Sequence, residues 1–180
     1  MKKVQSLLLF AFVLMFSAAC TNKAAENELK ELQSKQQIEE QNKSIVQRYW
    51  VGKWNERRPE ILDELQTSDV VYHGTSMSMN GLDEYKQVYS GYLAALQNSH
   101  VDIEGLMADG DLVMSRCKIT AVHGGELDGL PPTGKTIETS MFTVFRLIDG
   151  KIAEEWEIMD ELGFMSQLGM ELQPKELVKD

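Results

Sequence analysis

The stretch "MFTVFRLIDGKIAEEWEIMD", Met141 to Asp160, decides how this chain folds. Two runs of alternating apolar residues flank Asp149 and Gly150, a residue pair that strongly favours a tight turn between antiparallel strands. A second turn of the same kind, "ADGD", lies earlier at residues 108–111. The pattern predicts an antiparallel meander of strands at residues 101–107, 111–122, 136–148 and 151–159.

The segments before this meander repeat their apolar residues with helical spacing. Tyr49 and Trp54 lie on one face of the first segment, and Pro59 suits the first turn of a short second helix. The short run "DVVYHG", residues 69–74, is typical of a strand, and a third helix is predicted from Leu82 to about Leu96. Helices first and an antiparallel sheet afterwards indicate an α+β domain, with the helices packed on one face of the sheet.

Alternation along the last strand predicts which side chains face the helices. Trp156 shares a face with Glu154 and Asp160, whereas Glu155 and Glu157 are expected to lie mostly on a solvated face. These positions make Asp160 the carboxylate expected to point into the domain.

The strand predicted at residues 136–148 is apolar on both of its faces. Phe142 and Val144 lie on one side, and Met141 and Phe145 lie on the other. A strand of this kind needs two covers. The helical layer is one cover, and a second subunit is the expected other, which predicts a homodimer.

The N-terminal residues form an export signal. Lys2 and Lys3 precede an apolar run from Leu7 to Phe16, which is shorter than the roughly 20 residues of a membrane-spanning helix. The segment 1–19 resembles a bacterial lipoprotein signal, which implies a lipid anchor on Cys20. The alternative is an ordinary signal peptide that leaves a free cysteine. The expected location is therefore the bacterial cell envelope.

Residues 20–41 are rich in Glu, Lys and Gln, and have few large apolar side chains. This composition predicts a polar, partly helical stalk, and a short coiled coil is the alternative. The domain itself is expected at residues 42–170, followed by a polar tail at 171–180.

Composition excludes several classes of function. The formal net charge of −10 disfavours binding to nucleic acid or to anionic lipid surfaces, so membrane contact is expected through the lipid alone. Phosphate-binding loops and nucleophile elbows are lacking in the sequence. His, Cys and acidic residues are not clustered at ligand spacing, so a structural metal site is not expected.

Residues 123–169 resemble the C-terminal half of the SnoaL-like polyketide cyclases, which belong to the nuclear transport factor 2-like superfamily. The loop "GLPPTGK", the hairpin "IDGKI" and the ending "EEW", "D", "LG", "QLG" carry the resemblance. It implies a cone, in which a curved antiparallel sheet is closed by helices around a pocket, and a dimer formed through the outer sheet face. It also implies that Asp160 acts as general acid and base in an intramolecular aldol closure without a cofactor.

The candidate catalytic residues have structural alternatives. Asp160 suits a base in an apolar pocket, but it also suits the N-cap of a following helix. His73 matches a histidine common in the family, where it would assist Asp160, and its alternative is a polar strand-end residue. The residues expected to contact a ligand are Trp156, His123, Tyr72 and Glu154, with His123 also suited to shaping a rim loop.

Two functions follow for this pocket. The first is a cyclase or isomerase of the ester cyclase type, anchored at the envelope and acting on a small carbonyl compound by carboxylate acid and base catalysis. The second is a module that binds an apolar small molecule or a lipid without catalysis. The pocket alone does not separate these functions.

Overall fold

A computed structural model describes residues 2–171 and 173, with side chains from residue 23 onward. The chain divides into two units, residues 1–38 and 39–180. In the first unit the side chains of Leu29, Leu32 and Ile38 are exposed on helix α1. Within the described part of the chain, we find no helix that is both long enough and apolar enough to cross a membrane.

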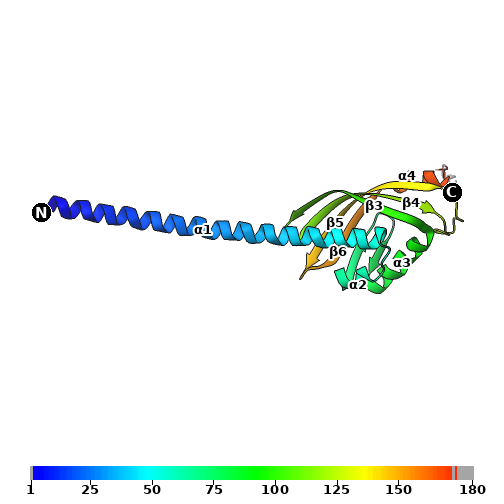
Figure 1. Ribbon diagram of the computed structural model, residues 1–180, viewed down its shortest axis with the longest axis horizontal. Helices are drawn as coiled ribbons and strands as arrows, with labels where there is room; N and C mark the ends of the chain where they lie inside the picture. Colours follow the sequence, from blue (N-terminus) through cyan, green and yellow to red (C-terminus); the bar gives the residue numbers. More distant parts are fainter. Residues whose placement is uncertain (1, 172, 174–180) are drawn as a thin grey trace, which may run out of the picture. The chain divides into compact units, whose positions relative to one another are not determined.

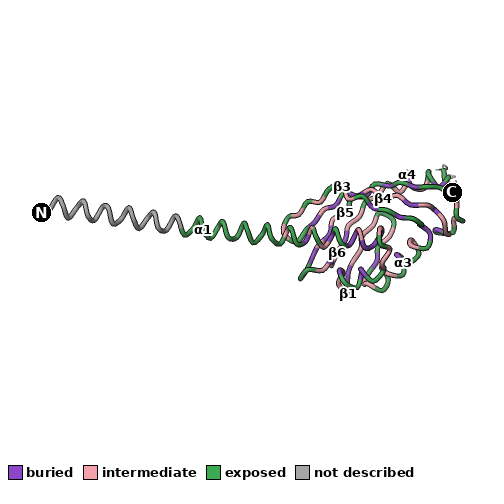
Figure 2. Tube along the Cα trace, in the orientation of Figure 1, coloured by how far each residue is buried: buried purple, intermediate pink, exposed green. Residues whose placement is uncertain are grey.

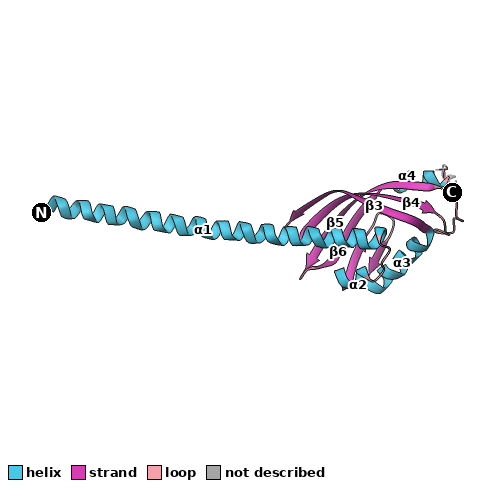
Figure 3. Cartoon of the chain, viewed as in Figure 1, coloured by secondary structure: helices cyan, strands magenta, loops and turns pink. Residues whose placement is uncertain are grey.

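Eleven elements follow one another along the described residues. The helical ones are α1 (Lys2–Trp50), the π-helix η1 (Val51–Asn55), α2 (Ile61–Leu65), α3 (Leu82–Ala95) and α4 (Glu161–Leu168). The strands are β1 (Gln66–His73), β2 (Ser78–Asn80), β3 (Leu96–Asp109), β4 (Leu112–His123), β5 (Thr136–Ile148) and β6 (Lys151–Met159). Their course is shown in Figures 1 and 3.

The strands form one six-stranded curved sheet in the order β2-β1-β6-β5-β4-β3. The predicted meander from β3 to β6 is confirmed, and β1 joins it in parallel beside β6. At the β5–β6 turn, Asp149 and Gly150 both have positive φ, 49° and 75°. Asp and Gly tolerate these angles, and tight hairpin turns require them. The predicted α+β fold is therefore confirmed.

A β-bulge in β6 decides which side chains enter the domain. Leu147 pairs with Ile152 and Arg146 pairs with Glu154, so Ala153 is an extra residue without a partner. A single extra residue inverts the alternation that follows it. Glu155 is consequently buried and Trp156 lies on the outer face, which is the reverse of the alternation expected from the sequence.

The core lies between the inner face of the sheet and the helices. Tyr49 and Trp50 at the end of α1 are fully buried and contact Phe145 of β5 edge to face. Figure 2 shows burial alternating along the strands. On the outer face, the opposed residues Phe142 and Ile158 remain 49% and 70% exposed.

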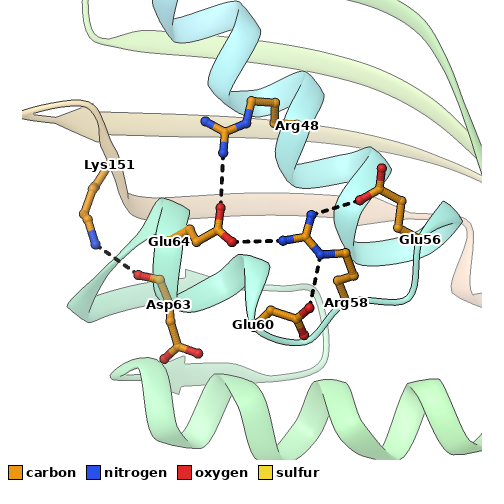
Figure 4. A network of polar contacts seen from close by, with 7 residues as sticks. All are labelled: Arg48, Glu56, Arg58, Glu60, Asp63, Glu64 and Lys151. Atoms are coloured by element: carbon orange, nitrogen blue, oxygen red, sulfur yellow. Dashed lines mark hydrogen bonds and ion pairs between the residues drawn. The ribbon is translucent and has the colours of Figure 1, made fainter.

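Exposed ion pairs hold the corner where α1 turns into α2 (Figure 4). Glu64 of α2 accepts from Arg48 of α1 at 3.2 Å and from Arg58 of the connecting loop at 2.9 Å. Each exposed pair contributes little stability, but together they connect α2 to the end of α1 and to the loop between them. Gly52 allows close packing there, because a Cβ would lie 2.7 Å from Cγ1 of Ile61. The corner therefore holds η1, with Lys53 and Trp54, against the domain.

Candidate functional site

A cavity of about 160 Å³ lies between the inner face of the sheet and helices η1, α3 and α4. Most of its wall is apolar, with tyrosine, tryptophan and phenylalanine rings from several elements. Five methionines also line it: Met77, Met79, Met141, Met159 and Met165. Aromatic rings and flexible thioethers form a wall that adapts to flat apolar ligands. An engineered cavity of about 150 Å³ holds benzene, so this one encloses about one ring.

Glu157 is the carboxylic acid that β6 directs to this cavity. Tyr72 of β1 donates its hydroxyl hydrogen to Oε1 of Glu157 at 2.8 Å, and the Thr143 hydroxyl donates to Oε2 at 3.3 Å. Burial raises the pKa of Glu157, although the positive charge of Lys53 and both hydrogen bonds act against it. A raised pKa lets a carboxyl group both accept and return a proton closer to neutral pH.

Lys53 lies on a second polar part of the wall. Its Nζ donates to the hydroxyl oxygens of Tyr49 and Tyr85 at 2.8 and 2.7 Å, and these hydroxyls also hydrogen-bond to each other. Both hydroxyls lie within hydrogen-bond distance of Glu155 Oε2, at 3.2 and 3.0 Å. Gln66 donates to the other oxygen of Glu155 at 2.9 Å. The amine and the carboxyl group are thus joined through two phenols.

Burial sets the proton affinities in this cluster. It lowers the pKa of Lys53, against the nearby carboxylates, and raises the pKa of Glu155, against the charge of Lys53. Both directions favour the neutral forms. Nζ of Lys53 also lies 4.9 to 5.7 Å from the centroids of five rings. Those rings belong to Tyr49, Trp50, Trp54, Tyr85 and Tyr89.

Asp160 lies outside the cavity lining. It is the N-cap of α4, and its exposed carboxylate accepts a hydrogen bond from the backbone N–H of Gly163 at 2.8 Å. The bulge in β6 and the start of α4 together direct the chain so that Glu157 lines the cavity instead. The sequence left two roles open for Asp160, a base in the pocket and a helix N-cap. Its geometry is that of the N-cap.

Three of the other predicted residues gather on the outer face of the sheet. His73 stacks on Trp156 with ring centroids 5.5 Å apart, and its Nε2 lies 3.0 Å from Oε1 of Glu154. Arg146 completes the group, 2.9 Å from the other oxygen of Glu154 and 5.1 Å from the centre of the Trp156 ring. His73 is therefore partnered with Glu154 and not with Asp160.

The remaining two candidates lie on the inner side. Tyr72 lines the cavity, as described above. His123 is fully buried at the end of β4, and its Nδ1 accepts from the backbone N–H of Thr133 at 3.3 Å. It lies outside the cavity lining, but the loop that it holds places Leu127 and Asp128 at the cavity. Cys20 is among the first 22 residues, whose side chains are not described.

Sequence reasoning missed Glu157, Glu155 and Lys53. A usable signal existed for Lys53, because this lysine lies four positions after Tyr49 and next to the i, i+4 pair Trp50 and Trp54, on an otherwise aromatic helix face. The glutamates had no such signal, because a bulge at Ala153 is not visible in the sequence. Among the described residues, no group of three or more His, Cys, Asp or Glu is placed to hold a metal ion.

Comparison with known proteins agrees with this geometry. A profile of the SnoaL-like polyketide cyclase family matches residues 44–168. The aklanonic acid methyl ester cyclase DauD of Streptomyces sp. (strain C5) is 25% identical over 126 residues, which are 69% of this chain and 77% of that protein.

Solved structures match the same region. A SnoaL-like protein from Jannaschia sp. CCS1 gives a TM-score of 0.69 at 22% identity, over 75% of this chain and 96% of that one. An LEH-like epoxide hydrolase from M. tuberculosis gives a TM-score of 0.59 at 17% identity, over 72% of this chain and 90% of that one. At such identities the likeness shows the fold alone, and this fold includes the elements that enclose the cavity.

Proposed function

Because the chain belongs to the SnoaL-like polyketide cyclase family, we propose that it is a cofactor-independent cyclase or isomerase acting on a small carbonyl compound. Glu157 is the general acid and base of this proposal. The observation that carries it is the Glu157 carboxyl group at an apolar cavity, held by Tyr72 at 2.8 Å and with its pKa raised by burial.

The reaction class follows from what such a carboxylate does to a carbonyl compound. Glu157 removes a proton from the carbon next to the carbonyl group, which leaves a nucleophilic carbon. That carbon attacks a second carbonyl of the same molecule to close a ring, or it is reprotonated elsewhere to give an isomer. The relative DauD is named as a cyclase, and it supports the first outcome.

The cavity limits the substrate. A volume of about 160 Å³ encloses roughly one ring, so the reacting part of the substrate is small and flat. The methionine and aromatic wall supplies apolar contact, and Tyr72 keeps the Glu157 carboxyl group in one orientation. Closely fitted geometry of this kind is what general acid and base catalysis requires.

The enzyme reading is tested by exchange of carbon-bound hydrogen. Cyclohexanone is a single six-membered ring, which is the size that the cavity volume encloses. Loss of its α-hydrogen signals in D₂O is followed by proton NMR with wild type, Glu157→Gln and Asp160→Asn. We expect wild type and Asp160→Asn to accelerate the exchange. For Glu157→Gln, the increase in exchange rate caused by the protein should be roughly 100-fold smaller. Equal rates for wild type and Glu157→Gln would reject Glu157 as the base. Bound cyclohexanone without exchange in any variant would favour the binding module.

We also propose that the protein is exported and anchored at the cell envelope through a lipid on Cys20. Support comes from the N-terminal sequence, in which Lys2, an apolar run and small residues precede Cys20. A homodimer through the outer sheet face is part of the same proposal. It is supported by the exposed, directly opposed pair Phe142 and Ile158.

A further inference from the structure

Lys53 is a buried amine at the cavity. It is 7% exposed and is the one lysine among the described residues that line the cavity. It is carried by η1, a π-helical turn of a kind found frequently at functional sites. Its Nζ lies 4.9 to 5.7 Å from the centroids of five aromatic rings. Phenol hydroxyls bridge Nζ and Oε2 of Glu155.

The hydrogen bonds leave part of this amine free to react. A lysine ammonium group has three N–H donors, and within the described part of the chain two of them are used, by Tyr49 and Tyr85. The same two phenols form a path for a proton from Nζ to Glu155 Oε2, with hydroxyl-to-carboxylate distances of 3.2 and 3.0 Å. A proton that moves along this path leaves a neutral, nucleophilic amine next to the cavity.

We propose that Lys53 forms a Schiff base with the carbonyl carbon of a small aldehyde or ketone bound in the cavity. The Nζ lone pair forms a bond to the carbonyl carbon, and the oxygen becomes a hydroxyl after proton transfer from nitrogen. The proton held by Glu155 returns through Tyr85 to that hydroxyl, which leaves as water while the C=N bond forms. The ammonium form of Lys53 and the carbonyl compound thus give a protonated imine and one water, with Glu155 holding the proton in between and without an oxidant or reductant.

The surroundings of Lys53 fit the charged product. The protonated imine carries a positive charge, which the five aromatic rings around Nζ stabilise. The Glu155 carboxylate, restored in the last step, lies beyond the phenols. Burial also lowers the pKa of Lys53, which makes the free amine accessible at lower pH than on surface lysines.

Schiff-base formation on Lys53 adds a covalent step to the proposed function. It rests on that function only where Glu157 removes a proton. A protonated imine acidifies the neighbouring C–H bond more than the parent carbonyl group does. Glu157 would then remove the proton and leave an enamine, whose carbon attacks the second carbonyl. Imine formation itself needs Lys53 and the phenols but not Glu157.

The test traps the imine. Full-length protein is incubated with cyclohexanone and sodium cyanoborohydride near neutral pH, and the products are measured by intact mass and by peptide mapping. We expect wild type to gain one cyclohexyl group at Lys53. Lys53→Arg keeps a cation but lacks a primary amine there, and we expect no such gain. The control Lys86→Arg, at a partly exposed lysine 2.7 Å from Asp63, should be labelled as wild type is.

The labelling and exchange results together distinguish the Schiff base on Lys53 from the assignment of Glu157 as the general base. Label at Lys53 in both wild type and Glu157→Gln supports the Schiff base even if no variant accelerates α-hydrogen exchange. Exchange without label at Lys53 overturns the Schiff base and leaves Glu157 as the base. Label spread evenly over surface lysines also overturns it. Mapping of wild type gives the answer even if Lys53→Arg fails to fold, which circular dichroism would show.

Discussion

Replacing Glu157 by glutamine is expected to stabilise the folded protein above about pH 5. The amide has nearly the shape of the carboxyl group. Its oxygen can still accept from Tyr72, and its nitrogen can donate to the Thr143 hydroxyl in place of the 3.3 Å bond to Oε2. Each such bond contributes about 1 kcal/mol net. Because both are kept, Glu157→Gln should change the free energy of unfolding by less than about 1 kcal/mol where Glu157 is protonated.

The pH dependence follows from the raised pKa of Glu157, which burial causes. A carboxyl group with a folded-state pKa above its unfolded value of about 4.3 stabilises the protein fully below that pH. It loses this contribution as the pH rises through the folded pKa. The glutamine variant has no such loss. Its advantage should therefore grow above pH 4.3, by at most about 1.4 kcal/mol per pH unit, and level off above the folded pKa.

The assay is urea unfolding at a series of pH values from 4 to 9 for wild type and Glu157→Gln, with cavity ligands absent. The difference between the two curves reports Glu157 together with its coupling to Lys53 and Glu155, because the charge of Glu157 acts to raise the pKa of both groups. Glu138→Gln is the control, since it removes an exposed carboxylate 3.0 Å from Lys118 and should leave the pH dependence nearly unchanged. A variant that is less stable than wild type at pH 8, with parallel curves, would refute the buried-carboxylate reasoning.

Four further outcomes are expected. Asp160→Ala should cost about 1 kcal/mol in urea unfolding and Asp160→Asn much less, because Asn caps nearly as well as Asp; an equal loss in both would contradict the cap. Phe145→Ala should lower the free energy of unfolding by about 3 to 5 kcal/mol, since this ring is fully buried. Phe142→Glu, on the outer face, should leave the fold intact and convert the dimer to a monomer in light scattering. A wild type that is already monomeric would reject the dimer. Cys20→Ser should move the protein from the detergent fraction to the soluble fraction, and an unlipidated wild type by mass spectrometry would reject the anchor.

The sequence by itself determined most of the elements and their order, although the π-helix η1 and the short strand β2 were not predicted. Asp149 and Gly150 specify a tight turn through their own backbone angles, which are positive in the structure. The apolar spacing around Tyr49 and Trp54 specifies a helix face, and alternation in residues 136–148 specifies a strand. These are local properties, because turn angles, helical period and strand alternation depend on residues close together in the chain.

The tertiary structure decided which carboxylates enter the domain. The bulge at Ala153 arises from the pairing of β6 with β5, so it depends on segments on both sides of a hairpin and on the cover that the helices provide. It exchanges the faces of Glu154 and Glu155, and with them the faces of Trp156 and Glu157. Asp160 was assigned to the wrong side because strict alternation was carried through this position.

The tertiary structure likewise decided the chemistry of Lys53. Its phenol partners come from α1 and α3, and the carboxyl group behind them comes from β6, 102 positions along the chain from Lys53 to Glu155. Burial among these distant segments shifts the pKa values of both groups, because removing water penalises their charged forms. Sequence neighbours fix where a side chain sits on its own helix or strand, whereas desolvation depends on every segment that packs around it.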